Sequence, residues 1–159
     1  MSDQNIAPFH GTCYTRLIVE RVPEGVRPEV HLQDKVEYLI FDMAQRGVVV
    51  RRNRLIQMTI DAPPGRVDGL YSKVKYEYAP PSPRDRERQV TARRRGWENG
   101  AIVRRFIQDG TPDEIRSIPT YEVSPFRPGI RHEDPEEALV LDFAWIRGFN
   151  AGKKGVRFT

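Results

Sequence analysis

The hydrophobic pattern of the first third of the chain changes its period, and this constrains the fold more than any other feature. Residues 13–22 (CYTRLIVERV) alternate between apolar and polar side chains, as a half-buried strand does. Residues 28–46 then repeat apolar side chains at helical spacing, with Pro28 in the first turn and Gly47 where a C-terminal cap belongs. The pattern predicts a strand followed by an amphipathic helix.

Two more strand-like segments follow this helix. Residues 48–60 are rich in β-branched side chains, with Ile56, Met58 and Ile60 on one face, and residues 70–78 (LYSKVKYEY) alternate again. The sequence between them, APPGRVDG, has the proline and glycine residues of a turn. The two segments therefore predict a hairpin.

The second half of the chain is more helical. A proline-rich stretch at 79–83 (APPSP) is a candidate boundary, although five residues are also an ordinary loop. Residues 84–107 contain no proline and favour a helix, whereas the prolines of 119–129 exclude a central strand position. A last helix begins after Asp134, a good N-cap, with Pro135 in its first turn.

This order predicts an α+β protein. We expect a single small domain over 13–159, with an antiparallel sheet that has helices on one face, preceded by an N-terminal arm at 1–12. The first six elements have the order of the ferredoxin-like βαββαβ fold, to which a C-terminal helix is added, and this is one arrangement that fits. An internal boundary at 79–83 remains open.

The composition favours a cytoplasmic protein without membrane contact. No run approaches the roughly 18 apolar residues that a membrane helix needs, and the N-terminal residues lack the pattern of a secretory signal. The single cysteine, Cys13, cannot form an internal disulfide, which suits a reducing compartment.

Positive charge is concentrated in one segment. The formal net charge is +4, and residues 84–105 contain eight arginines against three acids. The eight are Arg84, Arg86, Arg88, Arg93, Arg94, Arg95, Arg104 and Arg105. A basic segment on a near-neutral body is typical of a phosphate-binding face. A solvated helix face with internal salt bridges has the same composition, so both interpretations stay open.

An Arg-Gly-aromatic-x-x-Gly pattern occurs twice, at 95–100 and at 147–152, 52 residues apart. Its glycines are Gly96, Gly100, Gly148 and Gly152. Glycine is common where helices end, which is one explanation of the pattern. In a continuous helix, glycines four residues apart would instead form a groove that another helix or a sugar-phosphate backbone could approach closely.

The second copy of this pattern resembles a segment of a known family. It is similar to the R-G-aromatic-x-A-G-x-x-G segment of bacterial ribosome modulation factor, and such segments also occur in small phage-encoded proteins. The similar residues are Arg147, Gly148, Phe149, Ala151, Gly152 and Gly155. The cysteine-proline-tyrosine that follows in that family is absent here. The resemblance implies contact with structured RNA.

The predicted sheet offers a second route to RNA. RNA-recognition domains share the βαββαβ order and stack bases on aromatic side chains of the sheet. The segment 70–78 lacks the glycine-aromatic core of their signature. Tyr71 or Tyr76 could still form a stacking platform, although strand tyrosines more often pack half-buried.

Catalytic and metal-binding patterns are weak. His10 and Cys13 stand in HGTC at a spacing that could hold a metal, but one such pair is far from a zinc signature. We find no nucleophile elbow, HExxH, phosphate-binding loop or dinucleotide fingerprint. The sequence therefore predicts no cofactor, metal or catalytic residue, and an enzyme would require carboxylates that only folding brings together, such as Asp42, Asp61 and Asp68.

Two functions fit these observations. The first is a small basic non-enzymatic protein that binds RNA or DNA, or a nucleic-acid-containing machine, through its arginine-rich helix. Arg147, Lys153, Lys154 and Arg157 would extend the basic surface. The alternative is a protein-interaction or assembly component: a phage-type accessory protein, an inhibitor of a host machine, or a subunit of a homo-oligomer or larger particle. The 13 prolines suit a chain that lies across neighbours.

Overall fold

The structure of the protein is a computed structural model that describes residues 13–66, 68–109 and 123–159. The described residues form two compact units. The first contains the residues up to 43 and those from 50 to 80, and the second contains 44–49 and the residues from 81 onward. The predicted arm at 1–12 lies outside the described residues.

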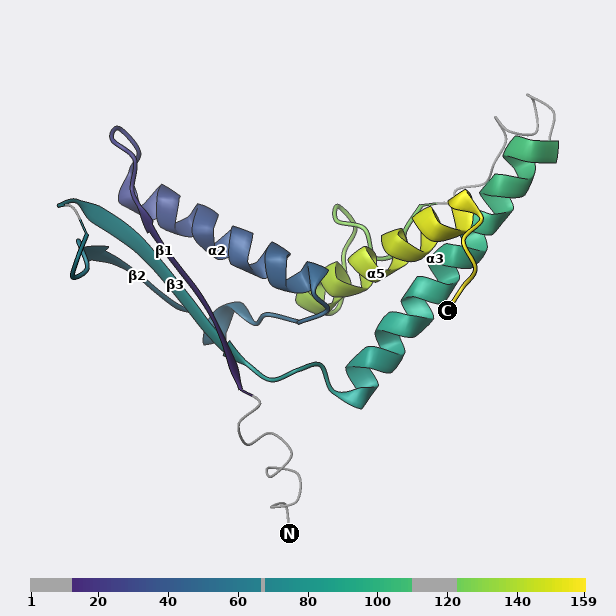
Figure 1. The fold of residues 1–159 in the computed structure, drawn as a ribbon, viewed down its shortest axis with the longest axis horizontal. Coiled ribbons are helices and arrows are strands. Elements are labelled where there is room, and N and C mark those ends of the chain that lie inside the picture. Colours follow the sequence, from purple (N-terminus) through teal and green to yellow (C-terminus); the bar gives the residue numbers. More distant parts are fainter. Residues whose placement is uncertain (1–12, 67, 110–122) are drawn as a thin grey trace, which may run out of the picture. The chain divides into compact units, whose positions relative to one another are not determined.

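The first unit is a small antiparallel sheet with one long helix. Its elements are β1 (Tyr14–Arg21), α2 (Pro28–Gln45), β2 (Ile56–Asp61) and β3 (Leu70–Tyr78). The strand order is β1-β3-β2, and both pairings are antiparallel. The helix α2 runs along one face of the sheet (Figure 1). The α+β class and the hairpin of β2 and β3 are therefore confirmed.

Polar contacts show which sheet face α2 covers. Arg16 on β1 donates to Asp42 on α2 at 2.7 Å, and the His31 ring nitrogen lies 2.8 Å from the Ser72 hydroxyl on β3. Side chains alternate along a strand, so the even-numbered residues of β1 and β3 face the helix. Val74, which no solvent reaches, lies at the centre of this contact.

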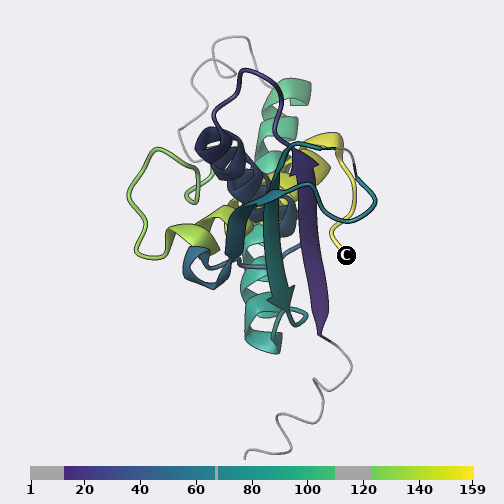
Figure 2. The same ribbon diagram turned by 90° about the vertical axis from the view of Figure 1, so that its left-hand side faces the viewer.

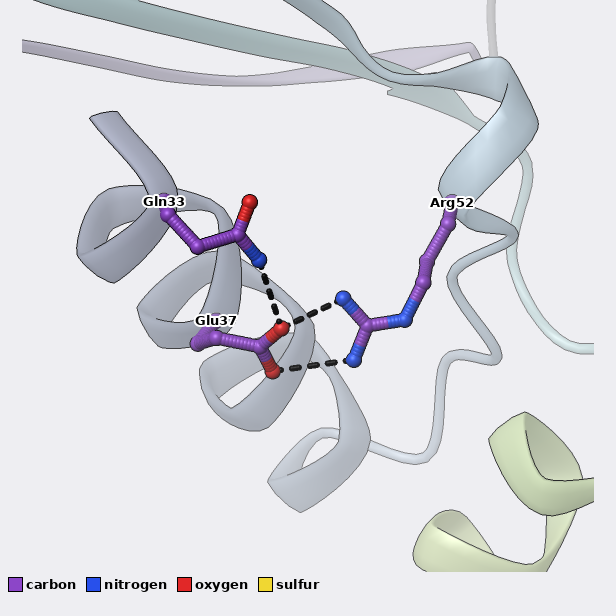
Figure 3. A network of polar contacts seen from close by, with 3 residues as sticks. All are labelled: Gln33, Glu37 and Arg52. Carbon is purple, nitrogen blue, oxygen red and sulfur yellow. Dashed lines mark hydrogen bonds and ion pairs between the residues drawn. The ribbon is translucent and has the colours of Figure 1, made fainter. Parts of the chain in front are cut away.

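The segment before β2 is not the strand that its β-branched residues predict. It contains a 3₁₀ turn, η2 (Arg52–Arg54), and pairing starts only at Ile56. Arg52 donates to both carboxylate oxygens of Glu37 on α2, and Gln33 donates to Glu37 at 3.1 Å (Figure 3). This network binds the turn to the helix, and Val50 is buried without a strand partner.

The second unit is built on two helices, α3 (Pro83–Asp109) and α5 (Pro135–Lys154). These two helices pack against each other. Among the described residues, α2 is therefore the helix that packs on the sheet within the first unit. The predicted segment 119–129 is described only from 123, where it forms bends and turns. The described residues thus contain the first strands of the ferredoxin-like order without its last strand. None of the described helices has the length and apolar character needed to cross a membrane.

Candidate nucleic-acid interface

The four motif glycines lie inside helices, where α3 and α5 cross. A Cβ atom at Gly96 would overlap the carbonyl oxygen of Trp145 and lie 3.0 Å from the amide nitrogen of Phe149. A Cβ at Gly100 would overlap the Phe149 carbonyl oxygen and lie 2.8 Å from the Lys153 nitrogen. Both clashes involve backbone atoms, so the helices approach as closely as they do because these positions have no side chain. We call this contact the glycine crossing.

The α5 glycines make the reciprocal contacts. A Cβ at Gly148 would overlap the Arg93 carbonyl oxygen, and one at Gly152 would overlap the Trp97 carbonyl oxygen. Adding 52 to each α3 residue number in these contacts gives the α5 residue of the matching contact. The pair therefore has a local pseudo-twofold relation. Later residues of one helix meet later residues of the other, so α3 and α5 run in the same direction, as Figure 1 also shows.

The equivalence of the two helices extends back to their first residues. The Asp85 amide donates to the Ser82 hydroxyl at 3.1 Å, and the Glu137 amide donates to Asp134 at 3.2 Å. A proline follows each of these two capping residues, which are also 52 positions apart. The glycine pattern is apparent from the sequence, but this matching start was not predicted: a capping residue, then Pro, then any residue, then an acid.

Every glycine of the segment that resembles ribosome modulation factor has a structural role here. Gly148 and Gly152 contact the α3 backbone. Gly155 ends α5 with a left-handed φ of 77°, and its amide donates to the Gly152 carbonyl at 3.1 Å. The closely approaching backbone is thus a helix of the same chain. The resemblance is explained in this protein without any RNA contact by the glycines themselves.

The residues after α5 fold back on α3. Trp97 donates from its indole nitrogen to the Val156 carbonyl at 2.7 Å, and its ring meets the edge of Phe158 with centroids 6.0 Å apart. The guanidinium carbons of Arg93 and Arg94 lie 4.4 and 4.3 Å from the Phe158 ring centroid. Cation–π contacts of this kind fix the position of a guanidinium while most of its N–H groups remain available.

Four of the twelve predicted basic site residues have partners within the second unit. Arg88 pairs with Glu137 at 2.8 Å, and Arg147 donates to the Gln45 carbonyl at 3.2 Å. Burial, with a smaller contribution from the charge of Arg93, lowers the pKa of Arg147 below its ordinary value. Arg93 and Arg94 hold Phe158. Arg88 and Arg147 are therefore engaged in packing the unit.

The other eight make no ion pair with a described residue, and they form two groups. They are Arg84, Arg86, Arg95, Arg104, Arg105, Lys153, Lys154 and Arg157. Arg84 and Arg86 lie in the first turn of α3, roughly 30 Å along the helix from Arg104. By contrast, Lys153 lies beside Gly100, and the Arg104 guanidinium lies against Gly155.

The predicted basic residues therefore do not form one continuous surface. Those from Arg93 onward lie with the basic residues of α5 at one end of the helix pair. From Arg93 to Asp109, the last residue of α3, and from Phe143 to Thr159 there are nine cations and two acids, Glu98 and Asp109. We call this region the basic end of the helix pair. The first turns of α3 differ, because Asp85 and Glu87 alternate there with the arginines.

The tyrosines proposed as a stacking platform do not form one. Tyr71 is 3% exposed and Tyr76 is 7% exposed, so neither ring presents a face to solvent. Tyr14 is exposed, but its ring lies 5.7 Å from that of Tyr78 at a tilt. The interpretation of Tyr71 and Tyr76 as base-stacking residues is therefore wrong for this conformation.

The polar residues that could suggest catalysis have other partners. His132 lies 2.8 Å from the Arg127 carbonyl, and Asp134 caps α5. Within residues 13–66, 68–109 and 123–159, no three His, Cys, Asp or Glu side chains are placed to share a metal ion. His10 of the HGTC pair lies outside these ranges, and Cys13 is exposed.

Comparison with known proteins gives no relative: no family model, curated protein or solved structure matches the chain significantly.

Proposed function

We propose that the protein binds nucleic acid, either free or within a ribonucleoprotein, through the basic end of the helix pair. One observation carries this proposal. Nine cations and two acids lie between Arg93 and the end of α3 and between Phe143 and Thr159. Such a density of like charge destabilises the fold by repulsion, and a polyphosphate chain would neutralise it.

The chemistry of these cations suits phosphate. Seven of the nine are arginines, whose planar guanidinium groups bind phosphate oxygens in pairs. The Phe158 ring contacts both Arg93 and Arg94, which lowers the entropy that their side chains would lose on binding. Contacts of this type position a nucleic acid without reading its sequence.

Fluorescence anisotropy with labelled single-stranded and duplex RNA and DNA tests the proposal directly. We expect the full chain to bind, and the logarithm of the affinity to fall linearly with the logarithm of the salt concentration, because counterions are released. Neutralising Lys153 and Lys154 together, as Lys153→Gln and Lys154→Gln, should weaken binding about tenfold and reduce the magnitude of the salt slope by about 1 to 2.

A matched control changes the same charge on the same helix pair. The variant Arg84→Gln with Arg86→Gln also removes two exposed cations, but from the first turn of α3. We expect it to change the affinity less than about threefold. Equal losses in the two variants would refute the basic end as the site. Absence of salt-dependent binding to all four nucleic acids would refute the function.

A further inference from the structure

The sheet face that α2 does not cover carries large apolar side chains in the first unit. The strand register places Leu17 of β1 and Ile56 of β2 on either side of Lys75, and Val19 and Met58 on either side of Lys73. Leu17, Ile56 and Met58 are 49%, 48% and 43% exposed. These residues form what we call the open sheet face. The three strands that carry it lie side by side (Figure 2).

This face combines apolar side chains and positively charged side chains, arranged along the strands. An apolar row on β1 and another on β2 flank the lysine row of β3, and neighbouring strands lie about 4.8 Å apart. The lysine stems are apolar, so they continue the surface between the rows while the ammonium groups remain in water. Lys75 pairs with Glu77 at 3.2 Å, whereas Lys73 makes no ion pair with a described residue.

The covered face shows what kind of element fits this sheet. There, α2 contributes an apolar stripe and places charges opposite those of the strands. Asp42 of α2 accepts from Arg16, and Lys35 of α2 pairs with Glu20 at 2.7 Å. A helix thus packs on this sheet through apolar contacts with opposite charges beside them. On the open sheet face the strand cations are Lys73, Lys75 and Arg21, and the one strand acid, Glu77, pairs with Lys75. The complementary helix would therefore present acids.

We propose that the open sheet face binds a partner protein through an acidic amphipathic helix, which would form a third layer over the sheet. Charge complementarity selects this occupant. A second copy of the same face would place lysine rows opposite each other, which is unfavourable. Nucleic acid would need an exposed aromatic ring or a denser set of cations, and Tyr71, the aromatic residue of this face, is buried.

The test uses the full chain and three labelled peptides of about 18 residues, long enough to form a helix. The first has an apolar leucine face flanked by glutamates, the second has lysines in place of the glutamates, and the third is a scramble of the first without an apolar face. We expect the first peptide to bind at least about tenfold more tightly than either of the others, because it alone supplies both chemistries.

Paired variants locate the binding site. Lys73→Glu with Lys75→Glu should weaken the acidic peptide at least about tenfold and strengthen the basic one. The control Lys153→Glu with Lys154→Glu makes the same charge change on the second unit and should leave the acidic peptide within about twofold. Met58→Gln, an exposed substitution that keeps all charges, should weaken the acidic peptide as well.

Several results would overturn the proposal. They are binding of neither amphipathic peptide, equal binding of the acidic peptide and its scramble, and an equal loss in the Lys73/Lys75 and Lys153/Lys154 variants. Self-association by light scattering that Met58→Gln abolishes would instead assign the face to a second copy. The proposal is independent of nucleic-acid binding, because its variants lie outside the basic end of the helix pair.

Discussion

In the first unit a helix packs on a sheet through large side chains, whereas in the second unit two helices pack through positions that have no side chain. Leu39 and Val36 lie on the buried side of α2 and are almost fully enclosed. Gly96 and Gly148 let the α3 and α5 backbones touch. The first contact should therefore fail when atoms are removed, and the second should fail when atoms are added.

The largest expected effect comes from adding two methyl groups at the glycine crossing. In Gly96→Ala with Gly148→Ala, each new Cβ would overlap a backbone carbonyl oxygen of the facing helix. Backbone atoms cannot rotate away as side chains can, so the helices must separate. We expect the free energy of unfolding to fall by about 4 kcal/mol. Trp97 and Trp145, the two tryptophans of the chain, report the transition by fluorescence during denaturant unfolding.

The sign of this effect separates the two explanations of the glycines. If they only sat in a solvated helix, alanine would stabilise each helix by up to about 1 kcal/mol. Glu98→Ala, an exposed change on α3, serves as the control and should stay within about 0.5 kcal/mol of the wild type. Because the crossing is pseudo-symmetric, the single variants Gly96→Ala and Gly148→Ala should cost similar amounts. A large difference between the two losses in the free energy of unfolding would contradict the reciprocal geometry.

The next largest effect comes from removing atoms in the first unit. Leu39 is 0% exposed and follows His31 and Lys35 at helical spacing on the side of α2 that faces the sheet. Leu39→Ala should lower the free energy of unfolding by about 3 kcal/mol, because it leaves a cavity. Far-UV circular dichroism and tyrosine fluorescence measure this, since five of the six tyrosines belong to the first unit.

The exposed neighbour Tyr38 supplies the control for this change. Tyr38 is 55% exposed, so Tyr38→Ala should change the free energy of unfolding by no more than about 0.5 kcal/mol. Should Leu39→Ala be as mild as this control, the contact of α2 with the sheet would not depend on side-chain packing. The contrast between the two units would then be lost.

The same contrast explains which parts of the fold the sequence predicts. The strand at 13–22, the helix at 28–46 and the hairpin were predictable because periodic apolar residues signal which side of an element is buried. Periodicity cannot say whether a face is covered, so Leu17 and Met58 resembled core residues although they are exposed. Val48 and Val50 suggested a strand because they are β-branched, but they are buried in the irregular segment between α2 and η2.

The candidate site was less predictable than the fold. The number of arginines in the sequence located the basic segment. Arg84 and Arg104, however, lie toward opposite ends of α3, so a high arginine content along the chain did not predict which residues share one surface. The glycine pattern was visible in the sequence. That each copy packs against the helix of the other was not predictable, because glycines at single positions give no periodic hydrophobic signal. The matching N-terminal caps of α3 and α5, 52 residues apart, were the sequence signal that could have shown that the two helices are equivalent.

The smallest expected effect concerns the ion pair between η2 and α2. The hydrogen bond from Arg52 lowers the pKa of Glu37 below its ordinary value; burial opposes this shift, and the charge of Arg52 adds to it. A carboxyl group whose pKa is lower in the folded state stabilises the fold above its unfolded pKa and loses that contribution as the pH falls through its folded pKa. Both side chains are about half exposed, so the contribution is small.

Glu37→Gln should therefore lower the free energy of unfolding by less than about 1 kcal/mol at pH 7, and the difference from the wild type should vanish in acid. Raising the salt concentration should also reduce it, because exposed charges are screened. Glu29→Gln, whose oxygen lies 3.8 Å from Arg27 at a more exposed position, is the matched control and should show a smaller difference. A Glu37→Gln difference that persists below pH 3 would mean that the side chain supports η2 by its packing and not by its charge, as the large side chains of α2 support the sheet.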